Sequence, residues 1–497
     1  MALAPFFDRI YGAVGAHLAV SRRSLTASLE STVVGVECGA PLSGNDKFIS
    51  EMIVNLVARL YPTLAISGHP ESIELLKPFA LEINPNIQFA PEAPAETTIC
   101  IGPSTARGAL YPSASGWVAR LAHNGPAPSG PTNPYSSAAA ASLACGELFR
   151  RIFLRSEPEG DFSLSLLDFG SETGEQLELD AAPLGRVLFV GVGAIGNAAI
   201  WTLARDTEIS GTLILIDHEL LSLSNLQRYV LGRYVDVSKS KVLLAAEHLS
   251  VSKITTATIL SSIEEFAPPE GWEQPPTTCV SVDNIVGRRV VQGLLPETVI
   301  NGWTGEASLG ASWHQLGRDV ACLACLYQPH SQGSSATQQA ARALGLSEER
   351  AALLWVTRAP LSNEERKHAA KQLGIKPSAL NDWKTRPLPD IYTDVVCGAV
   401  PIDIQAVGRI EVVPLAHQSV LAGSLMAAEL IKRTQSSLRK LSQPEPLVVW
   451  DNILKPPPKS WVRPRPREAG CICTDSVYQQ LYREKWGNRK DKGESQL

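Results

Sequence analysis

The chain has 497 residues, a formal net charge of -5 and 44% hydrophobic residues. At roughly 150 residues per domain, this is enough for about three domains with buried cores, and the apolar content excludes an intrinsically disordered chain. Acidic residues outnumber basic ones, 50 to 45, which argues against nucleic acid as a partner. The nine cysteines suggest no disulfide framework, and the amino terminus lacks signal-peptide features, so we expect a cytoplasmic protein without a membrane span.

Residues 1–160 alternate between short apolar strands and helices, which is typical of a parallel sheet with covering helices. Strands are expected at 32–36, 64–67 and 98–102, and helices at 48–61 and 136–154. Ser136 or Ser137 is expected to cap the last helix. No glycine-rich turn occurs here, so nothing in this segment indicates a nucleotide site. The polar, acidic stretch 161–180 is interpreted as a linker.

The rest of the chain reads as a second α/β domain with an insertion. Its first part is expected at 181–330 and its second part at 398–475, with a strand at 410–413 and a helix at 417–432. Between them, residues 331–397 are rich in Ala and Leu, and Ser362 to Glu365 has capping-box spacing, which predicts a helical insertion. A final helix and a disordered tail are expected at 476–497.

A glycine-rich turn marks the start of this second domain. It follows an apolar strand at 186–190, opens a helix, and reads Gly191-Val192-Gly193-Ala194-Ile195-Gly196. Such a turn lets backbone N–H groups approach a phosphate at the helix N-terminus. The next strand, 213–216, is followed by Asp217, whose carboxylate can accept hydrogen bonds from ribose hydroxyls. The pattern predicts a nucleotide site, and by itself it fits NAD and ATP equally.

Charged residues downstream distinguish these nucleotides. Arg228 ends the string Ser224-Asn225-Leu226-Gln227-Arg228, Lys241 follows, and Asp283-Asn284 comes after an apolar strand. Attack on an α-phosphate needs cations over the phosphates and a carboxylate for Mg²⁺, whereas hydride transfer needs neither. Singly, these residues also read as surface cations and a helix cap. Their occurrence together favours ATP.

These elements together resemble the ThiF/MoeB superfamily, which includes the ubiquitin-activating enzymes; the resemblance covers 184–432 apart from the insertion. It implies adenylation of the C-terminal glycine of a ubiquitin-like protein with ATP and Mg²⁺. Asp217 would hold the ribose, Asn225, Arg228 and Lys241 the phosphates, and Asp283 the Mg²⁺. Further nucleotide contacts would come from Gly191, Gly193, Ala194, Ile195, Gly196, Glu219, Gln227 and Asn284. The chain departs from the family pattern at Glu219, often Asp, and at Tyr229, often Gln.

The cysteines fall into three groups. Two close pairs, Cys322/Cys325 and Cys471/Cys473, offer four thiolates for a structural Zn²⁺, although they could also be unrelated reduced thiols. Cys397 lies at the end of the helical insertion, beside Gly398. The resemblance implies that its thiol takes the activated protein as a thioester. The alternative is a buried, inert cysteine. We expect the core to contain Cys38, Cys100, Cys145 and Cys279.

The fold expected from the resemblance is α/β with two Rossmann-like ThiF-type adenylation folds, of which the N-terminal one is inactive, and a helical insertion that carries Cys397. The chain would be a pseudo-dimeric monomer or a homodimer, completed by an arginine from near the N-terminus, for which Arg9, Arg22 and Arg23 are the candidates. No fused conjugating-enzyme domain is expected.

This layout resembles the activating enzyme of bacterial ubiquitin-like conjugation operons such as the Bil antiphage type. It implies a ubiquitin-like protein and a separate conjugating enzyme as partners, with ATP, Mg²⁺ and structural Zn²⁺ as cofactors. Three alternatives stay open. They are sulfur-carrier activation of the ThiF/MoeB type, an NAD-dependent oxidoreductase, and a catalytically silent scaffold that binds a ubiquitin-like protein.

Overall fold

The computed structural model describes residues 3–7, 14, 22–104, 109–155, 160–305, 308–328, 337, 340–341, 344–372, 377–389, 391, 414–442, 447–451, 455, 457–458 and 460–493. The chain divides into two compact units. The first comprises residues 1–5, 28–328 and 414–497, and the second comprises 6–27 and 329–413. None of the helices in the described part combines the length and apolarity that crossing a membrane requires.

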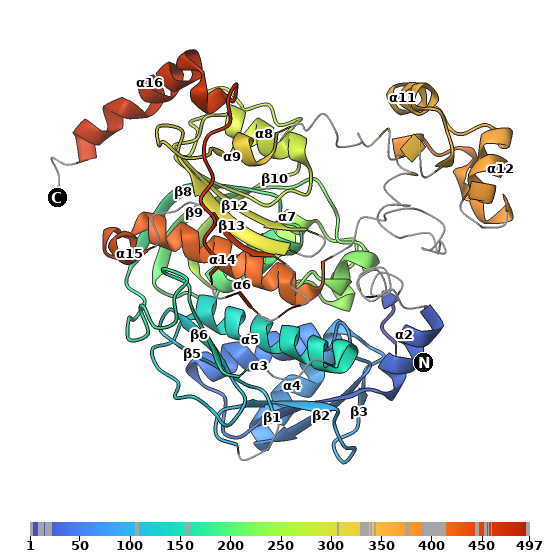
Figure 1. The fold of residues 1–497 in the computed structure, drawn as a ribbon, viewed down its shortest axis with the longest axis vertical. Coiled ribbons are helices and arrows are strands. Elements are labelled where there is room, and N and C mark those ends of the chain that lie inside the picture. The colour runs from blue at the N-terminus through green and yellow to red at the C-terminus, as the bar shows by residue number, and fades with distance from the viewer. Residues whose placement is uncertain are drawn as a thin grey trace. The chain divides into compact units, whose positions relative to one another are not determined.

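The N-terminal half of the first unit, residues 28–165, is built on a parallel four-stranded sheet with the order β3-β2-β1-β4 (Figure 1). Its strands are β1 (Val33–Cys38), β2 (Thr63–Gly68), β3 (Gln88–Phe89) and β4 (Thr97–Ile101). The connecting helices are α3 (Gly44–Val57) and α4 (Pro70–Ile83), preceded by α2 (Arg22–Ser31). The strands predicted from apolar runs are confirmed, and the helix predicted at 48–61 begins and ends four residues earlier.

A second, antiparallel sheet completes this half. It contains β5 (Tyr111–Ser115), β6 (Val118–Ala122) and β7 (Phe162–Ser165). The strand β7 lies inside the stretch that we interpreted as a linker, which therefore belongs partly to this sheet. Helix α5 (Pro134–Phe149) continues as a π-helix, Arg150–Leu154. Its cap is Asn133, whose side chain accepts from two backbone N–H groups, and not Ser136 or Ser137 as predicted.

The second half, residues 182–328 and 414–493, contains a seven-stranded sheet with the order β10-β9-β8-β11-β12-β13-β14 (Figure 1). The strands are β8 (Ala182–Val190), β9 (Ile209–Ile216), β10 (Lys253–Ile259), β11 (Thr277–Val280), β12 (Thr298–Thr304), β13 (Ser308–His314) and β14 (Leu447–Asp451). The first five are parallel, and β13 and β14 run antiparallel to their neighbours. Because β14 follows the insertion in sequence, the chain returns to the sheet it had left.

The helices of this half are α6 (Ala194–Leu203), α7 (Lys241–Leu249), α8 (Ile285–Gly293), α9 (Leu323–Leu326), α14 (Ala416–Thr434), α15 (Ser436–Leu441) and α16 (Ser476–Gly493). The helix predicted at 417–432 is thus confirmed as α14. The predicted strand at 410–413 lies outside the described residues. The tail that we expected to be disordered after Trp486 is helical as far as Gly493.

The two parallel sheets share one topology. In each, the first strand in sequence lies between the second and the fourth, which is the order 3-2-1-4 of a doubly wound nucleotide-binding fold. Helices α5, α6 and α14 pack against one another between the sheets (Figure 1), and all sixteen residues of α5 are buried. The predicted α/β architecture with Rossmann-like parallel sheets is therefore confirmed.

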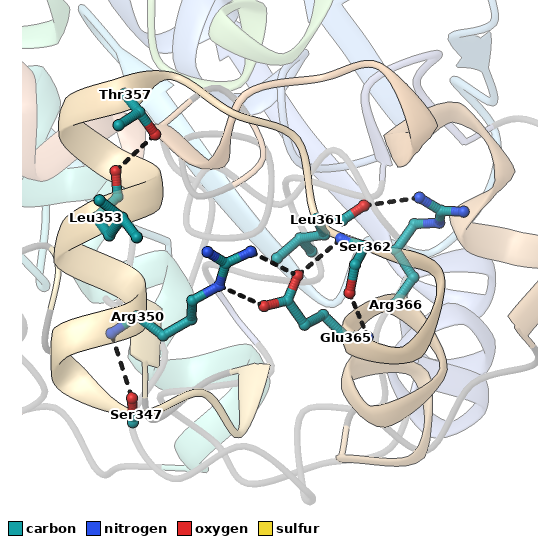
Figure 2. A network of polar contacts seen from close by, with 8 residues as sticks. All are labelled: Ser347, Arg350, Leu353, Thr357, Leu361, Ser362, Glu365 and Arg366. Carbon is teal, nitrogen blue, oxygen red and sulfur yellow. Dashed lines mark hydrogen bonds and ion pairs between the residues drawn. The ribbon is translucent and has the colours of Figure 1, made fainter.

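The second unit is helical where it is described, as predicted for the insertion. Its elements are α11 (Glu348–Thr357), α12 (Asn363–Gln372) and a 3₁₀ segment at Pro377–Lys384, packed around buried Leu354, Leu380 and Trp383. Figure 2 shows how Glu365 joins α11 to α12. Its carboxylate accepts from the guanidinium of Arg350 at 2.6 Å and from the backbone N–H of Ser362 at 2.7 Å, while Ser362 Oγ accepts from Glu365 N. This confirms the predicted capping box.

Candidate nucleotide site and cysteine centre

The predicted nucleotide residues follow three neighbouring strands of the seven-stranded sheet. Val190, at the end of β8, pairs in parallel register with Ile216 of β9 and with Val280 of β11. The carboxyl ends of these strands therefore meet at one edge, where the strand order reverses between β8 and β11. Ligands of open α/β sheets bind at this point. The glycine turn, Asp217 and Asp283 leave the sheet here.

The glycine turn has the close packing and the open approach that a phosphate site needs. Gly191 has a φ of +88°. A Cβ atom added at Gly196 would lie 2.2 Å from the carbonyl oxygen of Gly191, so only glycine lets α6 begin this close to the strand. A Cβ atom added at Gly193, the N-cap of α6, would meet nothing in the described chain within 4 Å beyond its own neighbours. This open side leaves room for a phosphate at the N-terminus of α6.

Asp217 fastens the second strand to this turn. One carboxylate oxygen accepts from the backbone N–H of Val192 at 2.7 Å, and the other accepts from the N–H of Glu219 at 2.9 Å. The side chain is half-buried, at the place where a ribose would lie beside the turn. The contact with Val192 gives Asp217 a structural role in addition to the predicted one.

Lys241 and Glu219 form an ion pair beside Asp217, in which the lysine is buried and the glutamate is half exposed. Burial acts to raise the pKa of Glu219, but the charge and hydrogen bond of Lys241 bring it below its ordinary value, aided by His218 and Arg228. Because Arg228 also acts on this carboxylate, both predicted phosphate-binding cations belong to one electrostatic cluster. Lys241 pairs directly with Glu219, and Arg228 contributes to the electrostatic environment of the same carboxylate.

The loop that carries Arg228 is short and tightly folded. Residues Leu223–Gln227 form a 3₁₀ turn in which the side-chain oxygen of Asn225 accepts from the backbone N–H of Ser222 at 3.1 Å. Arg228 follows at once and is half-buried, while Gln227 and Tyr229 are buried. Tyr229, where the family often has Gln, has its ring 6.0 Å from the ammonium of Lys241.

The residues after β11 divide into an exposed and a buried group. Asp283 is exposed, as a carboxylate that binds Mg²⁺ together with substrate phosphates must be. Asn284 caps α8 by accepting from the N–H of Gly287 at 2.6 Å. Arg288 is buried against the ring of Tyr327 and donates to Asn301 and to the carbonyl of Gly302 at 3.2 Å. Arg288 therefore connects α8 to β12 instead of facing the open edge.

Two residues of the N-terminal half contact the Arg228 loop, and neither was predicted. Arg59 and Asn55, at the end of α3, donate to backbone carbonyls of this loop. Arg22 and Arg23, two of the predicted N-terminal arginines, are exposed on α2, and Arg9 lies outside the described residues. One sequence signal could have indicated Arg59. The helix after the first strand of each half is followed by an Ala-Arg pair, Ala58-Arg59 and Ala204-Arg205.

The corresponding edge of the N-terminal sheet has different chemistry. The turn after β1 contains Pro41, which has no N–H to offer a phosphate. A Cβ atom added at Gly39 would lie 1.6 Å from the carbonyl oxygen of Pro103, so the chain itself packs against this turn. The residue that follows β2 is His69, where Asp217 follows β9. In the described residues, neither the turn after β1 nor the end of β2 therefore offers the groups that we expect to bind nucleotide in the second half.

The two predicted cysteine pairs meet in one buried cluster. The sulfur atoms of Cys322, Cys325, Cys471 and Cys473 all lie within 4.8 Å of one another. Neighbouring sulfur atoms are 3.4–3.8 Å apart, and tetrahedral Zn²⁺ with Zn–S bonds of about 2.3 Å would separate them by about 3.8 Å. Hydrogen bonds from Cys322 and Cys473 lower the pKa of the Cys325 thiol. Number, spacing and chemistry of these thiols fit a structural Zn²⁺.

Buried polar contacts surround this cluster. The backbone N–H of Glu468 donates to the sulfur of Cys325 at 3.4 Å, and the N–H of Leu323 donates to Gln292 of α8 at 2.9 Å. The ring of His314 lies between the carbonyl of Ala321 and the hydroxyl of Ser312, each 2.8 Å away. Burial lowers the pKa of His314 to about 4. The cluster therefore joins α8 and β13 to the C-terminal segment.

The other described cysteines are buried thiols that are poorly suited to act as nucleophiles. Cys38, Cys100, Cys145 and Cys279 are all buried, as predicted. Burial raises the pKa of Cys38 to about 12 and that of Cys100 to about 11, and it also raises the pKa values of Cys145 and Cys279. A thiol of this kind stays protonated at neutral pH and is a poor nucleophile. Cys397, the predicted acceptor, lies outside the described residues.

The fold and the site define a class: an α/β protein with a Rossmann-like nucleotide site at the switch point of a mixed sheet. Comparison with known families gives two matches. Residues 164–453 match the ThiF family, and residues 40–154 match a family described as Prokaryotic E2 family C. The first match covers more than half of the chain, which therefore belongs to the ThiF family. The second is at odds with our expectation of no conjugating-enzyme domain, since E2 is the general term for such enzymes.

Similar proteins are found among sequences and among solved structures. The uncharacterized protein y4jF of Sinorhizobium fredii is 32% identical over 522 residues, 98% of each chain. The adenylyltransferase and sulfurtransferase MOCS3 of Caenorhabditis briggsae is 28% identical over 189 residues, 36% of this chain and 44% of that protein. MccB of E. coli, solved among other forms with ATP, is 18% identical with a TM-score of 0.33, covering 58% of this chain and 65% of that one.

Proposed function

We propose that this chain is a ubiquitin-activating-type enzyme. It would adenylate the C-terminal glycine of a bacterial ubiquitin-like protein with ATP and Mg²⁺ and then transfer it to a cysteine as a thioester. The observation that carries the proposal is the convergence of the glycine turn, Asp217 and Asp283 at the carboxyl ends of three adjacent strands, with Lys241 and Arg228 acting on one carboxylate beside them. An NAD-dependent oxidoreductase has no use for this pair of cations.

In this mechanism the chain positions the reactants and supplies charge. The N–H groups at the start of α6 and the two cations hold the phosphates, and Asp217 holds the ribose. Asp283 would help to hold Mg²⁺, which would supply positive charge to the phosphate oxygens. The substrate carboxylate is already ionised, so it attacks the α-phosphorus without a general base, and pyrophosphate leaves. The acyl-adenylate then reacts with a thiolate, which displaces AMP.

Cys397 is the proposed acceptor of the acyl group. Four of the described cysteines form the candidate zinc site, and the other four are buried thiols with raised pKa values. Both cysteines within the segment matched to Prokaryotic E2 family C, Cys100 and Cys145, belong to the second group. This favours a separate conjugating enzyme as the next acceptor. We propose that the N-terminal half serves as the inactive partner of the adenylating half, and antiphage defence as the biological setting.

The test is the intact mass of the protein after incubation with ATP, Mg²⁺ and its co-encoded ubiquitin-like partner. We expect a reducible adduct equal to the partner minus water, absent from Cys397→Ala. ATP cleavage to AMP and pyrophosphate without an adduct would replace thioester transfer by sulfur-carrier activation. Absence of turnover, together with partner binding that survives Asp283→Ala, would leave a scaffold.

A further inference from the structure

In each half, the helix that follows the first of the parallel strands ends in the same way, and each end contacts the other half. Arg59 and Arg205 both stand two residues beyond the last residue of their helix, α3 and α6. The guanidinium of Arg205 forms an ion pair at 3.1 Å with Glu51 on α3. That of Arg59 reaches the loop that carries Arg228. The two arginines thus occupy corresponding positions in the two halves but have different partners.

Arg59 is buried, and its hydrogen-bond partners in the described part of the chain are all uncharged oxygens. It is 1% exposed, and its three hydrogen bonds go to the side-chain oxygen of Asn55 at 2.9 Å, to the carbonyl of Leu226 and to the carbonyl of Gly232 at 2.9 Å. Asn55 in turn donates to the carbonyl of Val230 at 2.9 Å. Burying a cation without an anionic partner is costly, and an apolar side chain of similar volume usually packs there at least as stably. Interface stability therefore does not explain an arginine here.

The positions of the carbonyl groups that Arg59 and Asn55 bind explain the presence of an arginine better. Leu226 precedes Arg228 by two residues, and Val230 and Gly232 follow it, so two side chains of the N-terminal half hold the backbone on both sides of the predicted phosphate-binding arginine. A guanidinium has a rigid fork of donors and can fix two carbonyls in one geometry, which a point donor cannot. Side chains of the second half contact the same stretch of backbone at Leu231. Its N–H donates to Asn197 at 3.2 Å, and its carbonyl lies 3.0 Å from the ring of His248.

We propose that Arg59 and Asn55 are positioning residues for the nucleotide site: the N-terminal half holds the 226–232 loop so that Arg228 meets the phosphates. The role of Arg228 rests on the proposed function. The inactive half would then contribute to adenylation through hydrogen bonds to the loop backbone, without contacting the nucleotide.

The test compares Arg59→Met with Arg205→Met, the matched control that breaks the interface ion pair and leaves the loop untouched. Kd for ATP and KM in ATP–pyrophosphate exchange are measured for each, with thermal unfolding as the check on folding. We expect Arg59→Met to raise both by about ten-fold or more, since small misplacements of a binding group have effects of this size. Arg205→Met should lower the melting temperature but keep the parent values.

Two further variants separate positioning from general damage. If Arg59 acts through Arg228, the double variant Arg59→Met/Arg228→Ala should bind ATP no more weakly than Arg228→Ala alone. Arg59→Lys should recover only part of the affinity, because a lysine cannot hold both carbonyls. Should Arg59→Met fail to fold, Asn55→Ala removes the Val230 bond and one of the three Arg59 bonds but keeps the guanidinium, and it should still weaken ATP binding.

The outcomes are distinguishable from failure of the proposed function. A parent protein that binds ATP but does not activate the ubiquitin-like partner would overturn the proposed function, and the ATP affinities would still test Arg59. A folded Arg59→Met protein with the parent Kd and KM would overturn the positioning role. Equal losses of affinity in Arg59→Met and Arg205→Met would do the same, since they would show a general effect of the interface.

Discussion

The buried ammonium group of Lys241 is paired with the carboxylate of Glu219, which lies two residues beyond the strand-end aspartate Asp217. The lysine begins α7, and its backbone N–H also donates to the carbonyl of Glu219 at 3.1 Å. The pair therefore connects the start of α7 to the carboxyl edge of the sheet. It places a cation beside the glycine turn by two separate contacts.

Lys241→Met should abolish most adenylation without unfolding the protein. The remaining Glu219 is half exposed and can be hydrated, so the melting temperature should change little. Loss of the cation should lower kcat/KM in ATP–pyrophosphate exchange by about 100-fold, the scale on which charge stabilisation acts in such sites. Lys239→Met is the control, because Lys239 is 48% exposed and pairs with Asp236 at 2.8 Å. If Lys241→Met catalysed ATP–pyrophosphate exchange with the parent kcat/KM, Lys241 would have no role in the nucleotide site.

Alanine at the two helix-end glycines should produce opposite results. Gly196→Ala places a methyl group 2.2 Å from the Gly191 carbonyl oxygen, and such overpacking should lower the free energy of unfolding by about 1–3 kcal/mol. Gly193→Ala meets no such contact and has an ordinary φ of -71°, so the protein should fold as before. The added methyl group should nevertheless weaken ATP binding. Denaturant unfolding and calorimetric titration measure the two effects, and full ATP affinity in Gly193→Ala would contradict the phosphate site.

The cysteine cluster should hold one zinc ion per chain. Cys473→Ser removes one thiolate of four, so zinc content measured by atomic emission should fall from about one ion per chain to near none, with a lower melting temperature. Chelation of the parent should shift the melting temperature in the same direction. Cys145→Ala is the matched control, since Cys145 is a buried cysteine of α5 outside the cluster. A parent protein purified with zinc present but free of metal would refute the assignment.

Stability of the helical unit should fall in acid through Glu365. The hydrogen bond of Arg350 and the capping contacts at Ser362, opposed by burial, lower the pKa of Glu365 to about 2 from an ordinary value of 4.5. A lowered carboxyl pKa stabilises the fold above the unfolded pKa, so this contribution should be complete above pH ~4.5 and disappear as the pH falls towards 2. Comparison of the parent with Glu365→Gln by circular dichroism between pH 6 and 2 measures it. Identical pH profiles for the two proteins would count against the role of this carboxylate.

Much of the second half was predictable because local pattern and tertiary position coincide there. A strand that ends in a glycine turn and a next strand that ends in Asp217 must meet at one sheet edge once the strands are parallel, and the register of Val190 with Ile216 confirms it. The cysteine pairs were also recognisable, although 146 residues separate Cys325 from Cys471. The spacing within each cysteine pair is a local property of the sequence. Few other residue types bind Zn²⁺ as thiolates do, so two such pairs predict a shared metal site.

Errors arose where a neighbour in space, and not the sequence pattern, determines the outcome. The strand β7 forms within the acidic stretch because β6 offers it a partner. The partner strand β6 lies outside the local window in which the acidic stretch was read. The cap at Asn133 is a different kind of error, because Asn followed by Pro134 is itself a local signal for a helix start.

The sequence alone therefore identified the candidate site residues of this protein, because the glycine turn, Asp217, the pair of cations and the two cysteine pairs all lie in short segments with recognisable spacing. Only the tertiary structure decided how the two halves cooperate. Arg59 stands 167 residues before the Leu226 carbonyl that it contacts, and nothing in its own helix distinguishes it from a surface arginine. A hydrogen bond to a backbone carbonyl leaves no mark on the sequence of its acceptor, because every residue has that carbonyl.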